Sequence, residues 1–230
     1  MTWKVNQDLI LLGAAGDSHN ISDIVLRIND QEETWNLLGF LDDDPEKQGT
    51  AVNGFPVLGP LTDFKEYPDC YFAGTFGSAK RNFNKKQVIN RLGIPIERYA
   101  TLVHPRATIS PSAKIGRGTV IYSEVFVGSN AVIGDHVKIL GQCNIGHDAV
   151  IGDFVTMSSL ALVLGKTNVG EGCYLGGGCR IKDHLKIGEW ALIGLGAVII
   201  KNVEPYNVVV GNPGRIIEIL NPDDFILESD

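Results

Sequence analysis

The sequence predicts a small α/β domain with a parallel sheet, followed by a long parallel β-helix built from hexapeptide repeats. Two observations carry this prediction. From Ile109 to Ile199 an aliphatic residue or Met recurs every six residues, for sixteen repeats without an insertion. Before that stretch, short apolar runs typical of buried strands alternate with segments of helical spacing over about a hundred residues.

The six-residue period is the stronger signal, because an amphipathic helix repeats at about 3.6 residues and a strand at about 2. Four residues after each repeat leader stands a second restricted residue that is small or aliphatic, from Ala113 through Cys143 to Val203. Both positions are therefore expected to face inward. Three hexads make one triangular coil of such a helix, so we expect five coils and a remainder, with residues eighteen apart stacked in columns.

The first hundred residues predict strands over 8–12, 36–41, 55–59 and 70–73, with helices over 21–28 and 80–92. This alternation is typical of a small parallel α/β sheet of Rossmann-like type. The dipeptide His104-Pro105 interrupts the strand and helix pattern just before the hexads begin. We therefore expect an N-terminal domain over 1–103, a β-helix domain over 104–214 and a C-terminal tail over 215–230.

Composition excludes several functional classes. With 44% hydrophobic residues and 20% charged residues, the chain of 230 residues is typical of a globular protein. The net charge of −7 argues against nucleic-acid binding, which needs a basic surface. No long apolar run or signal-peptide pattern is present, so we expect a cytoplasmic protein without a membrane partner. Three of the four cysteines occupy inward repeat positions, which favours small core residues over metal ligands or disulfides.

A ligand site is predicted where the strands of the N-terminal domain end. The first strand runs into a glycine turn, Gly13-Ala14-Ala15-Gly16, which opens the first helix and suits a phosphate. The ends of later strands supply Asp42-Asp43 and Thr75-Phe76-Gly77. In an open parallel sheet these ends share one crevice, so a nucleotide is expected there. The alternative is that Asp42 to Asp44 form only a solvated turn. The GxGxxG fingerprint is absent, which disfavours a nicotinamide cofactor.

The stacking of the coils singles out His147. Its column places Gly165 above it, and the neighbouring column places Lys166 above Asp148. A histidine beside a carboxylate, with open space above, is the arrangement that a general base requires. The alternative is an ordinary surface histidine, and that interpretation is kept for His136 and His184.

Another column, Ser159, Gly177 and Leu195, suggests with Gly165 a shallow groove for an extended ligand such as acyl-coenzyme A. Arg180, Lys182, Lys186 and Lys201 could meet its phosphates. Glycine is also expected at tight corners for conformational reasons alone. The histidine spacing of the zinc-binding hexapeptide proteins, such as the gamma-class carbonic anhydrases, is missing, so no metal is expected.

Several motifs together resemble one family. They are the turn Gly13 to Gly16, Phe40-Leu41-Asp42-Asp43, Gly77-Ser78 with Arg81, His104-Pro105, Asn144 to Asp148, and Gly211-Asn212-Pro213. Over residues 8 to about 216 the chain resembles bacterial sugar acyltransferases of the sialic-acid O-acetyltransferase type, most closely the nucleotide-linked amino-sugar N-acetyltransferases of the bacillosamine type. The resemblance implies a left-handed β-helix, a homotrimer with active sites between protomers, acetyl-CoA as co-substrate, and a sugar nucleotide held by the N-terminal domain.

By the same resemblance, His147 would be the catalytic base, with Asp148 in place of the family's usual Glu. Gly13, Ala14, Ala15, Asp42, Asp43 and Phe76 would hold the nucleotide, together with Gly16 and Gly77 from the strand-end argument. Thr156, Gly177 and Leu195 match acetyl-CoA contact positions, and Gly165 joins them from the column map as a possible source of an oxyanion-binding amide. Two departures are Thr156, where some members have a second histidine, and Gly214, where Ala is usual.

The predicted function is acetyl transfer from acetyl-CoA to the amino group of a UDP- or dTDP-linked amino-deoxy sugar. No Ser or Cys stands in a base-activated setting, so direct transfer is expected rather than a covalent enzyme intermediate. Two alternatives stay open. The chain could be an O-acetyltransferase acting on a sugar such as sialic acid, or a non-catalytic scaffold that binds a sugar nucleotide.

Overall fold

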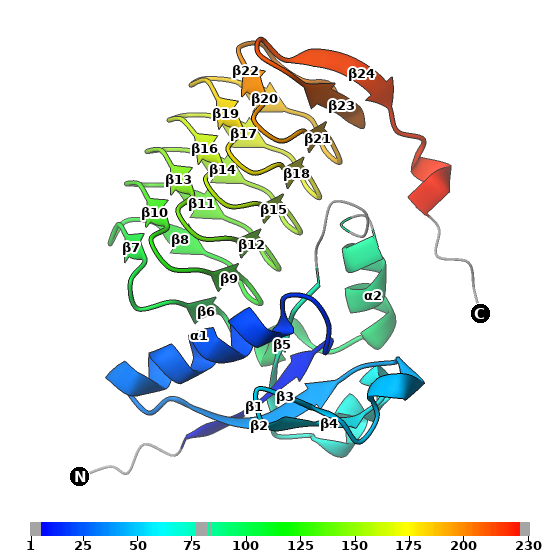
Figure 1. Cartoon of the computed structure of the whole chain (residues 1–230). Helices are drawn as coiled ribbons and strands as arrows, with labels where there is room; N and C mark the ends of the chain where they lie inside the picture. The colour runs from blue at the N-terminus through cyan, green and yellow to red at the C-terminus, as the bar shows by residue number, and fades with distance from the viewer. Residues whose placement is uncertain (1–5, 77–81, 83, 226–230) are drawn as a thin grey trace.

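A computed structural model of the chain describes residues 6–76, 82 and 84–225, and it contains the two folds that the sequence predicts (Figure 1). A small sheet with helices forms one end of the molecule. Stacked coils of short strands form the other, a left-handed β-helix. Within the described residues, no helix combines the length and apolar character needed to cross a bilayer.

The N-terminal sheet has the strand order β3-β4-β2-β1-β5 and is parallel except for the β3–β4 hairpin. Its helix α1 covers one face, burying Ile21, Ile24 and Val25. The elements are β1 (Gln7–Leu12), α1 (Ser18–Gln31), β2 (Trp35–Leu41), η1 (Pro45–Lys47), β3 (Ala51–Val52), β4 (Phe55–Gly59), η2 (Leu61–Glu66), β5 (Tyr71–Gly74), α2 (Asn84–Leu92) and η3 (Ile96–Arg98). The sequence predicts the parallel strands and both helices, and it misses the two-residue β3.

The β-helix consists of two-residue strands, each ending on a predicted repeat leader. They are β6 (Leu102–Val103), β7 (Thr108–Ile109), β8 (Lys114–Ile115), β9 (Val120–Ile121), β10 (Phe126–Val127), β11 (Val132–Ile133), β12 (Lys138–Ile139), β13 (Asn144–Ile145), β14 (Val150–Ile151), β15 (Thr156–Met157), β16 (Leu162–Val163), β17 (Asn168–Val169), β18 (Tyr174–Leu175), β19 (Arg180–Ile181), β20 (Lys186–Ile187), β21 (Leu192–Ile193) and β22 (Val198–Ile199). Only β6, whose second residue is Val103, precedes the predicted series.

Parallel pairing between strands eighteen residues apart confirms the predicted coil. Phe126 pairs with Asn144, for example, and Asn144 with Leu162. The leaders and the small residues four positions later fill one continuous core, including Cys143, Cys173 and Cys179 as free, buried thiols. Burial raises the pKa of each of these three thiols to about 12, so they are inert apolar side chains at neutral pH.

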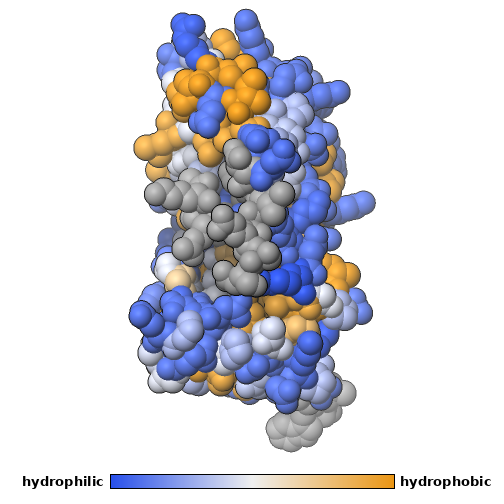
Figure 2. Space-filling model, turned by 90° about the vertical axis from the view of Figure 1, so that its right-hand side faces the viewer, coloured by the Kyte–Doolittle hydropathy of each residue, from blue (hydrophilic) through white to orange (hydrophobic). Residues whose placement is uncertain are grey.

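Three sheets form the walls of the β-helix. We name them by their strands: the β7 sheet runs from β7 to β22, the β8 sheet from β8 to β20, and the β6 sheet from β6 through β12 and β15 to β24. The last strands are β23 (Asn207–Val210) and β24 (Arg215–Ile219), which pair antiparallel and precede η4 (Pro222–Phe225). Apolar side chains gather at this end (Figure 2), where Ile216, Ile217 and Ile219 are exposed. The predicted boundaries of the three segments stay a prediction.

The N-terminal domain packs against the β6 sheet. Lys138 of β12 forms an ion pair with Asp17, with 3.1 Å between Nζ and Oδ2. Asn82 accepts a hydrogen bond from Thr156 of β15 and donates one to the carbonyl oxygen of Gly172. The other two sheets meet at the far corner of the triangle, away from this domain. This arrangement decides which parts of the site one chain can bring together.

Candidate active site

The glycine turn after β1 is held in place by hydrogen bonds to its backbone. The Gly13 amide donates to the carbonyl oxygen of Leu41 at 2.7 Å, and the Thr75 hydroxyl donates to the carbonyl oxygens of Leu12 and Gly13. Gly13 has a φ of +99°, and a Cβ there would lie 2.6 Å from Thr75 Oγ1. Only glycine fits this approach, so the turn can sit close to β5.

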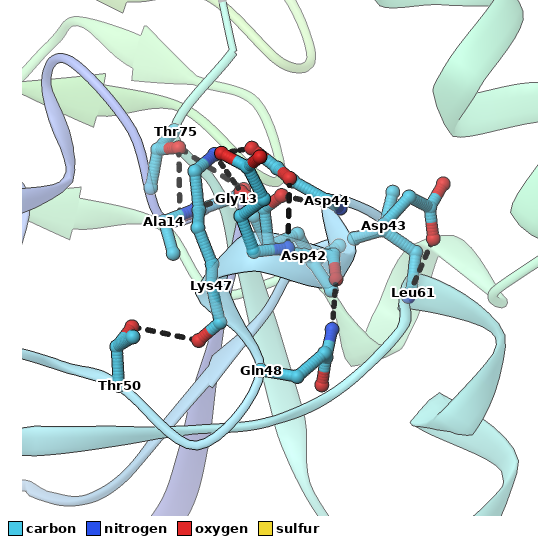
Figure 3. Close-up of polar contacts among 12 residues, drawn as sticks. Gly13, Ala14, Asp42, Asp43, Asp44, Lys47, Gln48, Thr50, Leu61 and Thr75 are labelled. Atoms are coloured by element: carbon cyan, nitrogen blue, oxygen red, sulfur yellow. Dashed lines mark hydrogen bonds and ion pairs between the residues drawn. The ribbon is translucent and has the colours of Figure 1, made fainter.

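Asp42 fastens the turn to the end of β2, as Figure 3 shows. Its carboxylate accepts hydrogen bonds from the Ala14 amide at 2.6 Å and the Asp44 amide at 2.9 Å, and it pairs with Lys47 at 3.0 Å. Burial would raise the pKa of Asp42, but these bonds hold it below its ordinary value. The carboxylate is therefore ionised and largely occupied by the protein itself, so we assign it first to shaping the site.

Asp43 has two partners of its own. One oxygen accepts from the Leu61 amide at 2.8 Å, and the other lies 3.2 Å from Nη2 of Arg91, an exposed pair. Because both aspartates are bonded in this way, the interpretation of Asp42 to Asp44 as a merely solvated turn does not describe them.

A pocket of about 620 Å³ opens at these strand ends. Its lining includes the predicted Gly13, Ala15, Gly16, Asp42, Asp43 and Phe76. Ala14 contributes its amide to Asp42, and Gly77 lies outside the described residues. The lining also includes Lys47, Lys85 and Arg91, which sequence reasoning missed. Lys85, Val88 and Arg91 are spaced three apart in the predicted helix, and that spacing could have placed them on one face.

The second part of the site is the corner between β13 and β14. His147 Nδ1 lies 2.7 Å from Asp148 Oδ2, and Asn130 donates to the other carboxylate oxygen at 3.1 Å. The hydrogen bonds from His147 and Asn130 hold the pKa of Asp148 below its ordinary value. The His147 side chain is 64% exposed. A proton on Nδ1, shared with the carboxylate, leaves Nε2 as the ring atom that can accept another.

The stacked coils determine where the imidazole lies. The Lys166 amide donates to the His147 carbonyl, and the His184 amide donates to the Gly165 carbonyl, as the eighteen-residue columns require. The ring lies against Gly165, because a Cβ at that position would be 2.8 Å from His147 Nε2. Gly165 is thus the residue type that permits this ring position.

The other predicted acetyl-CoA residues lie elsewhere. Gly177 and Leu195 share a different corner, between the β6 and β7 sheets, where Leu195 is 83% exposed. Thr156 is 1% exposed, and its hydroxyl donates to Asn82 at 2.6 Å. One chain therefore brings His147, Asp148 and Gly165 together at one corner. The other predicted acetyl-CoA residues, Thr156, Gly177 and Leu195, lie away from that corner. Among the described residues, no group of His, Cys, Asp and Glu has the arrangement of a metal site.

Comparisons with known proteins agree with this architecture. The PglD N-terminal domain family matches residues 8–92. The acetyltransferase domain of PglB from Neisseria gonorrhoeae FA1090, in complex with acetyl coenzyme A, is 29% identical with a TM-score of 0.79. That match covers 93% of this chain and 100% of the other. The domain match and this structural likeness together support a sugar acyltransferase of the bacillosamine type. The family predicted from the sequence is thus confirmed.

Two further matches extend the comparison. A variant of perosamine N-acetyltransferase from Caulobacter crescentus, in complex with CoA and GDP-perosamine, has the same fold at 22% identity, with a TM-score of 0.81 and coverage of 92% and 97% of the two chains. Serine acetyltransferase from Mycobacterium tuberculosis is 42% identical over 65 residues. This match spans only 28% of that enzyme and 27% of this chain.

Proposed function

We propose that this sugar acyltransferase transfers the acetyl group of acetyl-CoA to the amino group of a nucleotide-linked amino sugar. The observation that carries the proposal is the 2.7 Å contact between His147 Nδ1 and Asp148 Oδ2, in a histidine whose side chain is 64% exposed and whose ring lies against Gly165. The likeness to the PglB acetyltransferase domain in complex with acetyl coenzyme A supports acetyl-CoA as the donor. The pocket at the glycine turn supports a nucleotide-bearing acceptor.

In the proposed reaction, His147 Nε2 takes a proton from the sugar's amine as the nitrogen lone pair attacks the thioester carbonyl carbon. The carbon–sulfur bond then breaks, the CoA sulfur leaves with the electron pair, and the proton held by the imidazole can pass to it. Asp148 holds the Nδ1 proton and stabilises the imidazolium, and Asn130 fixes the carboxylate. The four cysteines, Cys70, Cys143, Cys173 and Cys179, are all buried, so none is placed to form a covalent acetyl intermediate, and the proposal is direct transfer.

We further propose a homotrimer, because the two parts of the site are separated within one chain. The N-terminal domain contacts the β6 sheet through Asp17 and Asn82, whereas His147 lies at the corner between the β7 and β8 sheets. A neighbouring copy could present its pocket to this corner, and its corner with Gly177 and Leu195 could complete an acetyl-CoA cleft. The cofactor roles of Thr156, Gly165, Gly177 and Leu195 stay predictions, as does a cytoplasmic location.

The test is a thiol-release assay of the full chain with acetyl-CoA. The acceptors are amino sugars linked to UDP, dTDP and GDP, with the free amino sugars and a sialic acid as controls. We expect CoA thiol and an N-acetylated product from one nucleotide-linked acceptor. Release of thiol only with sialic acid would favour the O-acetyltransferase alternative. Tight nucleotide binding without thiol release from any acceptor would favour the scaffold.

A further inference from the structure

Lys85 lines the nucleotide pocket but does not fit its surroundings. It is the second residue of α2 and only 6% exposed. Its Nζ atom is enclosed and has no hydrogen-bond partner among the residues that the structure describes. A buried ammonium without a partner is costly, and buried lysines are normally paired. The position therefore needs an explanation beyond stability.

The other cations of the pocket do have partners. Lys47 pairs with Asp42 at 3.0 Å, and Arg91 pairs with Asp43 at 3.2 Å. The charged neighbour that most affects Lys85 is a second buried cation, Lys138, which pairs with Asp17 at 3.1 Å. Lys85 is thus close to another positive charge, that of Lys138. The carboxylate of Asp17 already pairs with Lys138.

Three electrostatic effects oppose a positive charge at this position. Burial lowers the pKa of Lys85 well below its ordinary value, and the charge of Lys138 lowers it further. Lys85 also stands in the first turn of α2, where the helix dipole favours anions over cations. A bound anion beside Lys85 would relieve all three effects.

We infer that Lys85 is an anion-binding residue that holds the diphosphate of the nucleotide sugar, an inference that rests on the proposed function. The same pocket is lined by Gly13, Ala15 and Gly16 of the turn before α1, which suits a phosphate. A lysine side chain is long and flexible enough to swing its ammonium into the pocket when an anion arrives. The diphosphate is the one strongly anionic part of a nucleotide sugar.

Binding of the diphosphate is then coupled to uptake of a proton by Lys85. The charged groups around Lys85 are Lys138 and Asp17 on one side, and the Asp42–Lys47 and Asp43–Arg91 pairs around the pocket. His136 is also close enough for its pKa to be lowered by Lys85. In the empty pocket, burial and the charge of Lys138 lower the pKa of Lys85 and so weaken its hold on the proton. The diphosphate restores that hold, so we expect net proton uptake on binding.

The test is isothermal titration calorimetry of the full chain with UDP, dTDP and GDP, and with the corresponding nucleosides. For the nucleotide that binds, Lys85→Met is expected to weaken diphosphate binding by roughly ten- to hundredfold and nucleoside binding less than twofold. Titrations in buffers of different ionisation enthalpy are expected to show proton uptake at pH 7.5 in the wild type and none in Lys85→Met. Lys85→Arg is expected to keep part of the affinity without proton uptake, because guanidinium is always charged.

Lys86→Met is the matched control, because Lys86 is the next residue of α2 and pairs at 2.5 Å with Glu171 instead of lining the pocket. It is expected to bind the diphosphate like the wild type. Without ligand, Lys85→Met is expected to raise the melting temperature, since it removes a buried amino group that has no hydrogen-bond partner among the described residues. If Lys85→Met does not fold, proton uptake by the wild type and its absence in Lys85→Arg still decide the question.

Two negative results have different meanings. Wild-type affinity and proton uptake in Lys85→Met would overturn the role of Lys85 and leave the proposed function standing. If the wild-type chain binds none of the three diphosphates, the proposed nucleotide-linked acceptor is wrong, and the inference fails with it.

Discussion

Two histidines at different corners of the same β-helix have opposite environments. His147 is 64% exposed at its side chain and hydrogen-bonded to Asp148. His136 is 5% exposed and stacks on Phe154, with ring centroids 5.2 Å apart, while Tyr99 meets its ring edge-on at 4.4 Å. The coil backbone is nearly the same at both corners, with φ of 54° at His136 and 57° at Asp148.

The difference comes from what covers each corner. Tyr99 belongs to the segment that joins the two domains, and it closes the corner at His136. No described residue of the chain covers the corner at His147 in the same way. A repeat thus determines where a side chain points, whereas the neighbouring domain determines whether it is a core residue or a candidate base.

The largest expected effect is that of His147→Ala. If this corner supplies the general base, the turnover number should fall by about 10²- to 10⁴-fold, because that is the usual contribution of a positioned base. Circular dichroism and the melting temperature should stay unchanged, since the side chain is exposed. Near-normal turnover with a good acceptor would rule out the proposed mechanism.

For His136 we expect an effect on stability instead. Burial, and then the charge of Lys85, lower the pKa of His136 to about 4, and Asp153 opposes them only in part. The unfolded chain protonates this residue near pH 6.5, so stability is intact above that value and falls as the pH drops toward 4. The loss is on the order of 3 kcal/mol, measurable by urea denaturation at each pH.

A His136→Phe variant tests the cause of that loss. Phenylalanine keeps an aromatic ring between Tyr99 and Phe154 without a titratable group. The decline in stability between pH 6.5 and 4 should become shallower by the same amount. An unchanged slope would mean that other groups, such as the paired carboxylates, account for the acid sensitivity.

A smaller effect is expected for Gly165→Ala. The added Cβ would lie 2.8 Å from His147 Nε2, so the ring must move from its present position. A ring displaced from its preferred rotamer costs about 0.5–1.5 kcal/mol, or roughly a two- to tenfold loss of kcat. In the control Gly141→Ala, the added Cβ would meet only Ser123, at 3.3 Å from its carbonyl oxygen, and kcat should not change.

The smallest effect is expected for His184→Ala. This histidine also lies at the corner of His147, two coils further on, with a side chain 64% exposed and Nε2 3.7 Å from Asp183 Oδ2. That distance is too long for the hydrogen bond that orients a base. Unfolding free energy should change by less than about 0.5 kcal/mol, and kcat by less than twofold. A large loss of kcat would show that the site extends along the corner.

The β-helix was predictable to the level of single side chains because one period determines it. The sixteen leaders, the inward cysteines and the stacking of Gly165 above His147 all follow from counting by six and by eighteen. In the N-terminal domain the strand-end rule also worked, since it brought Gly13, Asp42 and Phe76 to one pocket. Both successes concern the backbone, whose repeats and chain order are visible in the sequence.

Contacts between the two domains were not predictable in this way. The prediction of a surface histidine is wrong for His136, which is buried under Tyr99. The columns give no reason to bury His136 while exposing His147, because the covering ring of Tyr99 belongs to another segment. The resemblance matches Thr156 to a cofactor position, yet its hydroxyl donates a hydrogen bond to Asn82 of the N-terminal domain. The enclosed Lys85 was missed because nothing in a helical pattern tells which of its cations lacks a carboxylate.

The placement of the N-terminal domain on the β6 sheet has a consequence for the kinetics. If His147 of one copy serves the acceptor pocket of another, no isolated protomer holds a complete reaction centre. Specific activity then follows mass action and declines on dilution below the dissociation constant of the assembly. Equal amounts of His147→Ala chains and chains defective in acceptor binding would, when exchanged into mixed oligomers, recover part of the lost turnover.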